Sequence, residues 1–285
     1  EGYGGGTSEA RLGRAVASSF SGAVAGQRAQ EGPSAIATKF LPTFWRCTRR
    51  SLVNAAQRSR DTLRLPRIPL YFIHTPVHWL PIELWIEAAC DAKDAGIIDN
   101  IGVSNFDKEQ VLRAQQVASR RGYSIAANQV MFGLLNFKNE MLKETIQTCK
   151  ELGIAIVAFS PIGQGLLTDN FSKELLTKNR VAKMTCVSET DLDKLRAELS
   201  SVAQETKKSM AQIALNWVMC HDCVPLVGCR SLTQAEDTLG CLGWRLSEEQ
   251  VQRLDAVSLG HSTLSGKKWK RVFFANLFGF VMVVA

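Results

Sequence analysis

Short apolar segments rich in β-branched residues alternate along this chain with longer stretches of helical periodicity, and this alternation constrains the fold most strongly. The segments predict six strands, at residues 34–39, 70–74, 100–104, 125–130, 154–159 and 224–227. Their nearly continuous apolar character is typical of parallel strands covered on both faces. Helical patterns lie at residues 83–95, 108–121, 140–152, 191–206, 210–219 and 233–241, and another begins at Ser247. The sequence therefore predicts a parallel sheet with helices outside it.

The spacing of the strand ends distinguishes two parallel architectures. The intervals are 35, 30, 25, 31 and 68 residues between Lys39, His74, Ser104, Gln129, Ser160 and Gly228. One strand and one helix fit each interval, and the last leaves room for a long inserted loop around residues 168–191. No Gly-x-Gly-x-x-Gly motif follows a strand, which argues against a doubly wound dinucleotide fold. We expect an α/β fold, a (β/α)8 TIM barrel without its first two strands, over residues 1–260, followed by a tail at residues 261–285.

Composition limits the compartment and the partners. The 285 residues carry 34 Lys and Arg against 27 Asp and Glu, a net charge of +7. This balance favours an anionic ligand or surface but is too small to indicate a nucleic-acid partner. The eight cysteines are scattered, without the density of a disulfide scaffold, which indicates a reducing compartment, either the cytoplasm or an organelle.

Polar side chains stand at the ends of five successive predicted strands. They are Lys39, His74, Ser104 with Asn105, Asn128 with Gln129, and Ser160. The carboxyl ends of barrel strands line the active site, and buried polar groups need partners. One or two polar strand ends are common in any α/β protein, whereas five in succession predict an active site.

The motifs at these positions resemble those of the aldo-keto reductases. They are Glu-Gly-Tyr-Gly at residue 1, Ala-Thr-Lys-Phe at 37, Leu-Tyr-Phe-Ile-His at 70, Ile-Gly-Val-Ser-Asn-Phe at 101, Asn-Gln-Val at 128, Phe-Ser-Pro-Ile-Gly-Gln-Gly-Leu-Leu at 159 and Ala-Gln-Ile-Ala-Leu-Asn-Trp at 211. Each motif alone is weak, but the ordered set is highly specific. The resemblance implies a (β/α)8 barrel that reduces a small carbonyl substrate, an aldehyde or ketone, to an alcohol with NADPH.

The resemblance also implies a catalytic set. Tyr3 would be the general acid that protonates the developing alkoxide, Lys39 would lower the pKa of Tyr3, and His74 would orient the carbonyl. A free phenol with a pKa of about 10 donates poorly at neutral pH, and a neighbouring ammonium stabilises the phenolate. The family's fourth catalytic residue, an Asp five positions before the Tyr, would fall ahead of Glu1. We therefore expect this chain to be incomplete and its full-length form to be active.

Further matching positions imply a cofactor site. Ser104, Asn105 and Gln129 would contact the nicotinamide carboxamide, and Phe159 would stack on the nicotinamide ring. The remaining positions would cover the pyrophosphate and the adenosine: Ser160, Pro161, Gly163 and Gly165, then Gly228, Arg230, Ser231, Gln234, Asp237 and Thr238. Arg230 and Ser231 would bind a 2′-phosphate, which favours NADPH over NADH.

Two residues depart from the family's pattern. Thr238 stands where the family commonly has Asn at the adenine, a change expected to loosen that contact. Asp99 stands where a basic residue, Glu or Gln usually precedes the strand that begins at Ile101. The sequence offers no interpretation of Asp99.

Two clusters outside the predicted site have competing interpretations. The run Cys220-His221-Asp222-Cys223 has the spacing of a metal or redox motif, but no second ligand pair accompanies it, so we predict no metal site. Seven arginines crowd one predicted helix and the turn after it: Arg46, Arg49, Arg50, Arg58, Arg60, Arg64 and Arg67. A solvated basic face is the favoured interpretation, and docking to an anionic membrane or acidic partner is the alternative.

The C-terminal tail has competing interpretations. Four basic residues between Lys267 and Arg271 precede an aromatic-rich apolar run at residues 272–285. This pattern suits a helix at a membrane interface or, if the run is truncated, a spanning helix; the other interpretation is a helix folded back over the barrel or its substrate cleft. For the whole protein, two functions are left open. The leading hypothesis is an NADPH-dependent reductase. The alternative is an NADPH-binding sensing module of the same fold that associates with a membrane partner.

Overall fold

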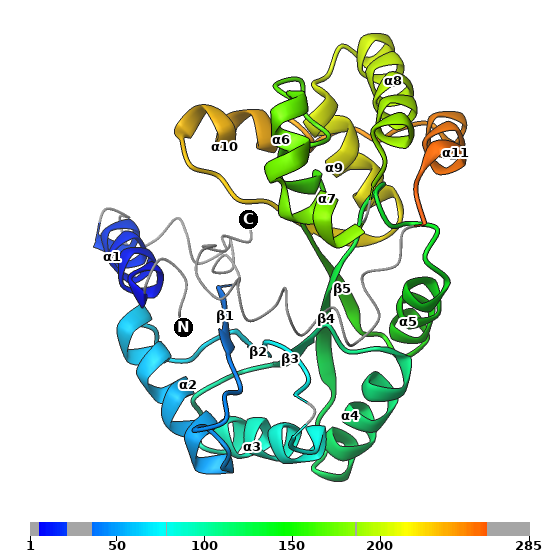
Figure 1. Cartoon of the computed structure of the whole chain (residues 1–285). Helices are drawn as coiled ribbons and strands as arrows, with labels where there is room; N and C mark the ends of the chain where they lie inside the picture. The colour runs from blue at the N-terminus through cyan, green and yellow to red at the C-terminus, as the bar shows by residue number, and fades with distance from the viewer. Residues whose placement is uncertain (1–5, 22–35, 78, 186, 261–285) are drawn as a thin grey trace. The chain divides into compact units, whose positions relative to one another are not determined.

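The computed structural model describes residues 6–21, 36–77, 79–185 and 187–260 (Figure 1). Within these ranges the chain forms two compact units. The first comprises residues 6–129 and 148–154, and the second comprises residues 130–147 and 155–260.

The six described strands are short, and every described pairing between them is parallel. Their order in the sheet is their order in the chain. A doubly wound sheet reverses its strand order at one point, whereas a barrel adds each strand beside the last. The predicted (β/α)8 type of fold is therefore confirmed. The strands are β1 (Ala37–Phe40), β2 (Leu70–Ile73), β3 (Ile101–Ser104), β4 (Ile125–Met131), β5 (Ala155–Phe159) and β6 (Cys223–Leu226).

Helices occupy the connections between strands, as the periodicity predicted. Asp107 caps α4, as expected, because its side chain accepts a hydrogen bond from the Gln110 amide at 2.9 Å. Ser247 caps the last described helix in the same way. The helices are α1 (Ser8–Ser21), α2 (Arg49–Leu63), α3 (Ile82–Asp94), α4 (Lys108–Arg120), α5 (Glu140–Glu151), α8 (Glu189–Thr206), α9 (Met210–Cys220), α10 (Leu232–Leu239) and α11 (Glu248–Val257).

The prediction of a long loop at residues 168–191 is wrong. This segment contains two short helices, α6 (Lys173–Lys178) and α7 (Arg180–Thr185), after the 3-10 turn η2 (Gly163–Gly165). A helix of six residues spans fewer than two turns at 3.6 residues per turn. An apolar period cannot be recognised over so short a stretch, which is why the sequence did not indicate these helices.

The first unit packs α2 against α1 and α3, and α3 against α4. Its core includes Phe40, Phe72 and Trp85, all fully buried, and the rings of Phe40 and Trp85 lie 5.2 Å apart. Helix α1 approaches α2 closely at Gly13, where a Cβ would lie 2.4 Å from the Thr62 carbonyl oxygen. The unit therefore holds β1 and β2 in a rigid, apolar frame.

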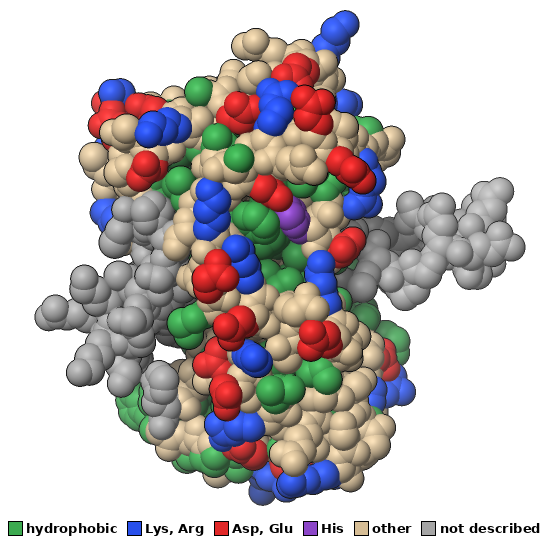
Figure 2. All heavy atoms as spheres, turned by 90° about the vertical axis from the view of Figure 1, so that its right-hand side faces the viewer, with side chains coloured by type: hydrophobic (Ala, Val, Ile, Leu, Met, Phe, Trp, Pro, Cys, Tyr) green, Lys and Arg blue, Asp and Glu red, His purple; other side chains and the backbone are tan. Residues whose placement is uncertain are grey.

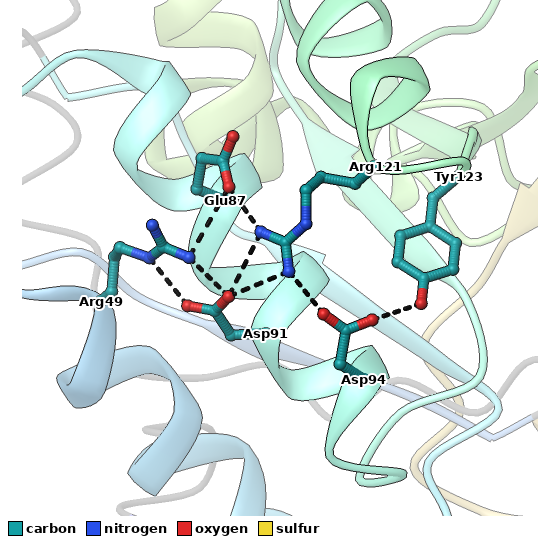
Figure 3. Close-up of polar contacts among 6 residues, drawn as sticks. All are labelled: Arg49, Glu87, Asp91, Asp94, Arg121 and Tyr123. Carbon is teal, nitrogen blue, oxygen red and sulfur yellow. Dashed lines mark hydrogen bonds and ion pairs between the residues drawn. The ribbon is translucent and has the colours of Figure 1, made fainter.

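Three of the seven arginines of the arginine-rich region, Arg49, Arg60 and Arg67, pair with carboxylates in the first unit. Arg49 on α2 binds Asp91 on α3 through two nitrogens, at 2.7 and 2.5 Å (Figure 3). Arg121, next to the end of α4, bonds to Glu87 at 2.6 Å, to Asp91 at 3.2 Å and to Asp94. Asp94 also accepts a hydrogen bond from Tyr123. Five charged side chains from α2, α3 and the residue after α4 thus form one network.

Other arginines of this region also have partners in the first unit. Arg60 Nη2 lies 2.9 Å from Asp61 Oδ1. The Arg46 guanidinium lies 5.5 Å from the centre of the Phe40 ring. Arg67 pairs with Asp99 at 2.7 Å, which gives the unexplained Asp99 a structural role. The pair joins the segments that lead into β2 and β3.

In the second unit, His221 belongs to an aromatic cluster. Its ring centre lies 4.4 Å from that of Trp217 and 4.7 Å from that of Phe137. His221 and Trp217 both contact one carboxylate oxygen of Asp255, at 3.1 and 2.7 Å. Among the described residues, no group of three or more His, Cys, Asp or Glu side chains is placed to hold a metal ion. The cluster gives His221 a packing role.

The described part of the chain contains no helix with both the length and the apolar character needed to cross a bilayer. The predicted tail at residues 261–285 lies outside the described residues.

Candidate active site

Lys39 occupies the carboxyl half of β1 and is almost completely buried, with 3% of its surface exposed. It lies opposite Phe72 in the β1–β2 register, and its Nζ lies 5.8 Å from the centre of the Phe72 ring. Burial lowers the pKa of the Lys39 ammonium to about 7. Lys39 can therefore gain or lose its charge close to neutral pH.

His74 lies one residue beyond β2, on the strand that neighbours β1. Its backbone amide donates to the Phe40 carbonyl at 2.9 Å, which continues the β1–β2 pairing. Burial, together with the nearby charge of Lys39, lowers the pKa of His74 to about 3. At neutral pH the imidazole is therefore uncharged, with one nitrogen that donates and one that accepts.

Three further predicted residues meet His74 in the first unit. The Ser104 hydroxyl donates to the Gln129 carbonyl at 3.0 Å, and the Asn105 backbone amide donates to the same oxygen at 2.8 Å. The Asn105 side-chain amide donates to Ser104 Oγ at 3.1 Å and to the His74 carbonyl at 3.4 Å. The structure thus brings together His74, Ser104, Asn105 and Gln129 at the ends of β2, β3 and β4.

Asn105 itself has a left-handed backbone, with φ of 59°. Asn adopts this conformation more readily than most residues, because its short polar side chain bonds locally. The left-handed turn directs the Asn105 amide back towards Ser104 and the end of β2. Asn105, directly after β3, therefore shapes this end of the sheet through its own backbone conformation.

In the second unit, a tight loop follows β5. Phe159 ends the strand half-buried, and Ser160 has φ of 55°. Gly133 packs against the loop so closely that a Cβ would lie 2.8 Å from the Pro161 carbonyl oxygen. Gly163 and Gly165 also have positive φ, 59° and 101°. Phe159, Ser160, Pro161, Gly163 and Gly165 thus lie in one tight loop, and its two glycines adopt positive φ without the steric cost of a side chain.

The segment after β6 is open to solvent. Gly228, Arg230 and Ser231 are exposed, and α10, which follows, has no buried residue. Ser231 caps α10 by accepting from the Gln234 amide at 3.2 Å, and Gln234 Oε1 accepts from the Arg230 amide at 2.8 Å. Arg230 thus stands beside the positive end of a helix, which suits an anionic ligand.

Asp237 and Thr238 are engaged within the second unit. The Asp237 carboxylate accepts from Ser209 at 3.0 Å and from Gln212 at 3.1 Å, so it ties α10 to the first turn of α9. Thr238 Oγ1 lies 3.8 Å from the Cys229 sulfur. The structure gives Asp237 a role in holding the helices, besides its predicted place at the adenosine.

One predicted catalytic residue, Tyr3, lies outside the described residues. Two contributors were missed by sequence reasoning: Asn179 and Arg196 both donate hydrogen bonds to the loop after β5. Nothing in the sequence pattern indicated them, because their partners are backbone carbonyls that many side chains could bind.

Comparison with known proteins identifies the family. The aldo/keto reductase family matches residues 1–259. A chloroplastic pyridoxal reductase of Arabidopsis thaliana is 31% identical over 254 residues, which cover 88% of this chain and 68% of that protein. A probable aldo-keto reductase of Glycine max is 27% identical over 200 residues, 68% of this chain and 56% of that protein. This chain therefore spans about two thirds or less of these two relatives.

Solved structures agree in fold. An aldo-keto reductase of Bombyx mori in complex with NADP has a TM-score of 0.68 at 21% identity, over 92% of this chain and 78% of that one. A holo aldo-keto reductase of Bacillus halodurans also has a TM-score of 0.68, at 20% identity, over 91% of this chain and 80% of that one. With the matching motifs and the strand-end cluster, these findings show that the chain belongs to the aldo/keto reductase family, a family of oxidoreductases.

Proposed function

We propose that the full-length protein is an NADPH-dependent reductase that converts a small aldehyde or ketone to an alcohol. Membership of the family supports carbonyl reduction in general. One observation carries the assignment to this chain: buried Lys39, with a pKa of about 7, and uncharged His74 stand beside Ser104, Asn105 and Gln129 at adjacent strand ends. Perturbed ionisable groups at strand ends are typical of active sites.

The residues present fit NADPH. Ser104, Asn105 and Gln129 offer amide and hydroxyl groups of the kind that bind a carboxamide. Arg230 and Ser231, exposed beside the N-terminus of α10, suit a 2′-phosphate. When bound, NADPH supplies the hydride. The Bombyx mori relative was crystallised with NADP, which supports the choice of cofactor.

Residues of this chain would supply the proton and assist its transfer to the substrate. Tyr3 donates its phenolic proton to the carbonyl oxygen as negative charge develops there. The Lys39 ammonium lowers the pKa of that phenol when charged. His74, uncharged at neutral pH, donates a hydrogen bond that orients the carbonyl, because a neutral imidazole still carries one N–H.

The proposed substrate class is reactive aldehydes, with pyridoxal first among them. The Arabidopsis thaliana relative carries the name pyridoxal reductase, and this supports the choice. We propose residues 1–260 as the catalytic domain and residues 261–285 as a tail that associates with membranes. For the compartment we propose the cytoplasm or an organelle, where the free thiols of the described cysteines stay reduced.

The test is NADPH oxidation by the full-length gene product with pyridoxal and other reactive aldehydes. We expect turnover that falls by at least about a hundredfold in Tyr3→Phe, because general acid catalysis contributes about that much. NADPH binding should persist in the variant. Tight NADPH binding without turnover on any aldehyde would favour the sensing module instead, and no binding would contradict both.

A further inference from the structure

The loop after β5 in the second unit has an unusual backbone. Four of its residues have φ near or above 55°: Ser160, Gly163, Gln164 and Gly165. For Ser160 and Gln164 the left-handed conformation is unfavourable, because their Cβ atoms crowd the following carbonyl. Such a conformation persists only where neighbouring groups determine it. Two side chains from outside the loop, those of Asn179 and Arg196, bind its backbone.

Asn179 is the first of these side chains. It lies between α6 and α7 and is 4% exposed. Its amide nitrogen donates to the carbonyls of Gly163 and Gln164, at 3.0 and 3.2 Å. Its amide oxygen accepts from the Ala182 backbone at 3.0 Å. Asn179 therefore joins the start of α7 to two of the loop's left-handed residues, Gly163 and Gln164.

Arg196 is the second. It reaches from α8, and its Nη1 donates to the carbonyls of Leu166 and Thr168, at 2.5 and 3.0 Å. The guanidinium also lies 4.3 Å from the centre of the Phe171 ring, which holds its plane. Burial lowers the pKa of Arg196, yet the group stays charged, because an arginine pKa begins far above neutral.

The two side chains together engage four carbonyl oxygens, those of residues 163, 164, 166 and 168. A carbonyl oxygen carries partial negative charge and would repel a phosphate. Successive backbone N–H groups in right- and left-handed conformations, in contrast, form concave anion sites. Four loop amides, those of residues 163, 165, 166 and 167, donate to carbonyls within the loop. The hydrogen bonds from Asn179 and Arg196 therefore favour an anion here by offsetting the partial negative charge of four carbonyl oxygens.

We propose that Asn179 and Arg196 are positioning residues that fix the loop at residues 160–168 in the conformation that binds the cofactor's pyrophosphate. This inference rests on the proposed function. Neither side chain needs to touch the cofactor, since both act through backbone carbonyls. The segment that carries Asn179, with α6 and α7, is thereby part of the binding machinery rather than a passive insertion.

The experiment compares NADPH affinity, measured by fluorescence, in the full-length protein and in Asn179→Ala and Arg196→Met. We expect each variant to bind NADPH about tenfold more weakly, because two hydrogen bonds to the loop are lost. Arg196→Lys, which keeps the charge and a donor, should lose less than Arg196→Met. Hydrogen exchange of the peptide at residues 160–171 should quicken in both variants, while exchange elsewhere stays the same.

Matched controls separate positioning from general loosening. Asn139→Ala removes an Asn that caps α5, and Arg253→Ala removes an Arg that pairs with Glu198 on the same helix as Arg196. Both should keep the wild-type NADPH affinity. Adenosine 2′-monophosphate, which lacks a pyrophosphate, should bind Asn179→Ala and Arg196→Met as it binds the wild type.

The outcomes are distinct. Equal weakening of NADPH and adenosine 2′-monophosphate, or unchanged NADPH affinity in folded variants, would overturn the positioning role and leave the proposed function standing. Failure of the wild type to bind NADPH would overturn the proposed function and this inference with it. If Asn179→Ala does not unfold cooperatively, the Arg196 pair of variants decides the matter.

Discussion

Lys39 is a buried ionisable side chain in β1, and His74 is a half-buried one directly after the neighbouring strand β2. Burial shifts both pKa values downwards, Lys39 to about 7 and His74 to about 3. Motif matching alone names these residues, but their protonation at neutral pH follows from their surroundings. A partly charged lysine beside a neutral imidazole suits a site where negative charge develops on a carbonyl oxygen.

The lowered pKa of Lys39 predicts a pH dependence of stability. Unfolded Lys39 holds its proton up to about pH 10.4, so between its folded value of about 7 and that pH the unfolded state binds more protons. Stability due to this residue therefore rises with pH in this window, by at most about 1.4 kcal/mol per pH unit. Below the window the cost of burying the charge is fully present.

Chemical denaturation of wild type and Lys39→Met from about pH 6 to about pH 9 measures this effect. We expect the variant to be the more stable protein at low pH and the two to converge as pH rises. Lys150→Met, at an exposed position, should show a difference that does not change with pH. A flat difference for Lys39→Met as well would contradict the lowered pKa.

At the scale of elements, the network in Figure 3 joins α2, α3 and the end of α4. Arg121 donates to three carboxylates of α3. The hydrogen bond from Tyr123, together with that from Arg121, holds the pKa of Asp94 below its usual range. Networks of this kind contribute more than isolated surface pairs, which are worth about 0–1 kcal/mol. The helices of the first unit are thus tied by charge as well as by apolar packing.

Removing the centre of this network tests its contribution. Arg121→Met should lower the free energy of unfolding by about 1–2 kcal/mol at low salt, and by less in high salt, because screening weakens the pairs in the wild type. Arg113→Met is the matched control, since Arg113 pairs with Glu83 alone among the described carboxylates and is half exposed. Equal losses in the two variants would show that the network adds nothing beyond single pairs.

At the scale of the whole molecule, the net charge of +7 is not gathered on the face drawn in Figure 2, where acidic and basic side chains of the described residues are interspersed. The strongest basic cluster in the sequence next to an apolar run is instead at residues 267–271, outside the described residues. A polybasic segment beside apolar residues binds anionic membranes through charge and burial together.

Deletion of residues 261–285 tests the tail. We expect the wild type to sediment with vesicles that contain phosphatidylserine, and less with vesicles of phosphatidylcholine alone, because each basic residue near an anionic surface adds about 1 kcal/mol. The deletion variant should stay in the supernatant and keep its NADPH affinity. Sedimentation that survives the deletion would assign any membrane affinity to another part of the chain.

Local patterns in the sequence determined most of the architecture. All six described strands were predicted to within a few residues, because a strand buried on both faces must be apolar along its length. Asp107 and Ser247 were recognised as helix starts because capping involves residues only three positions apart. The sequential order of motifs likewise predicted the family, which the comparisons confirmed.

Tertiary structure alone decided the rest. The short helices α6 and α7 form where no full apolar period exists. Asp99 pairs with Arg67, which lies 32 positions earlier in the chain. Asn179 and Arg196 bind backbone carbonyls 15 to 30 residues earlier in the chain, and no residue type at those carbonyls signals the contact. The pKa of Lys39 depends on how completely its neighbours exclude water. Sequence periodicity reports short-range geometry, whereas burial and long-range partners exist only once the chain is folded.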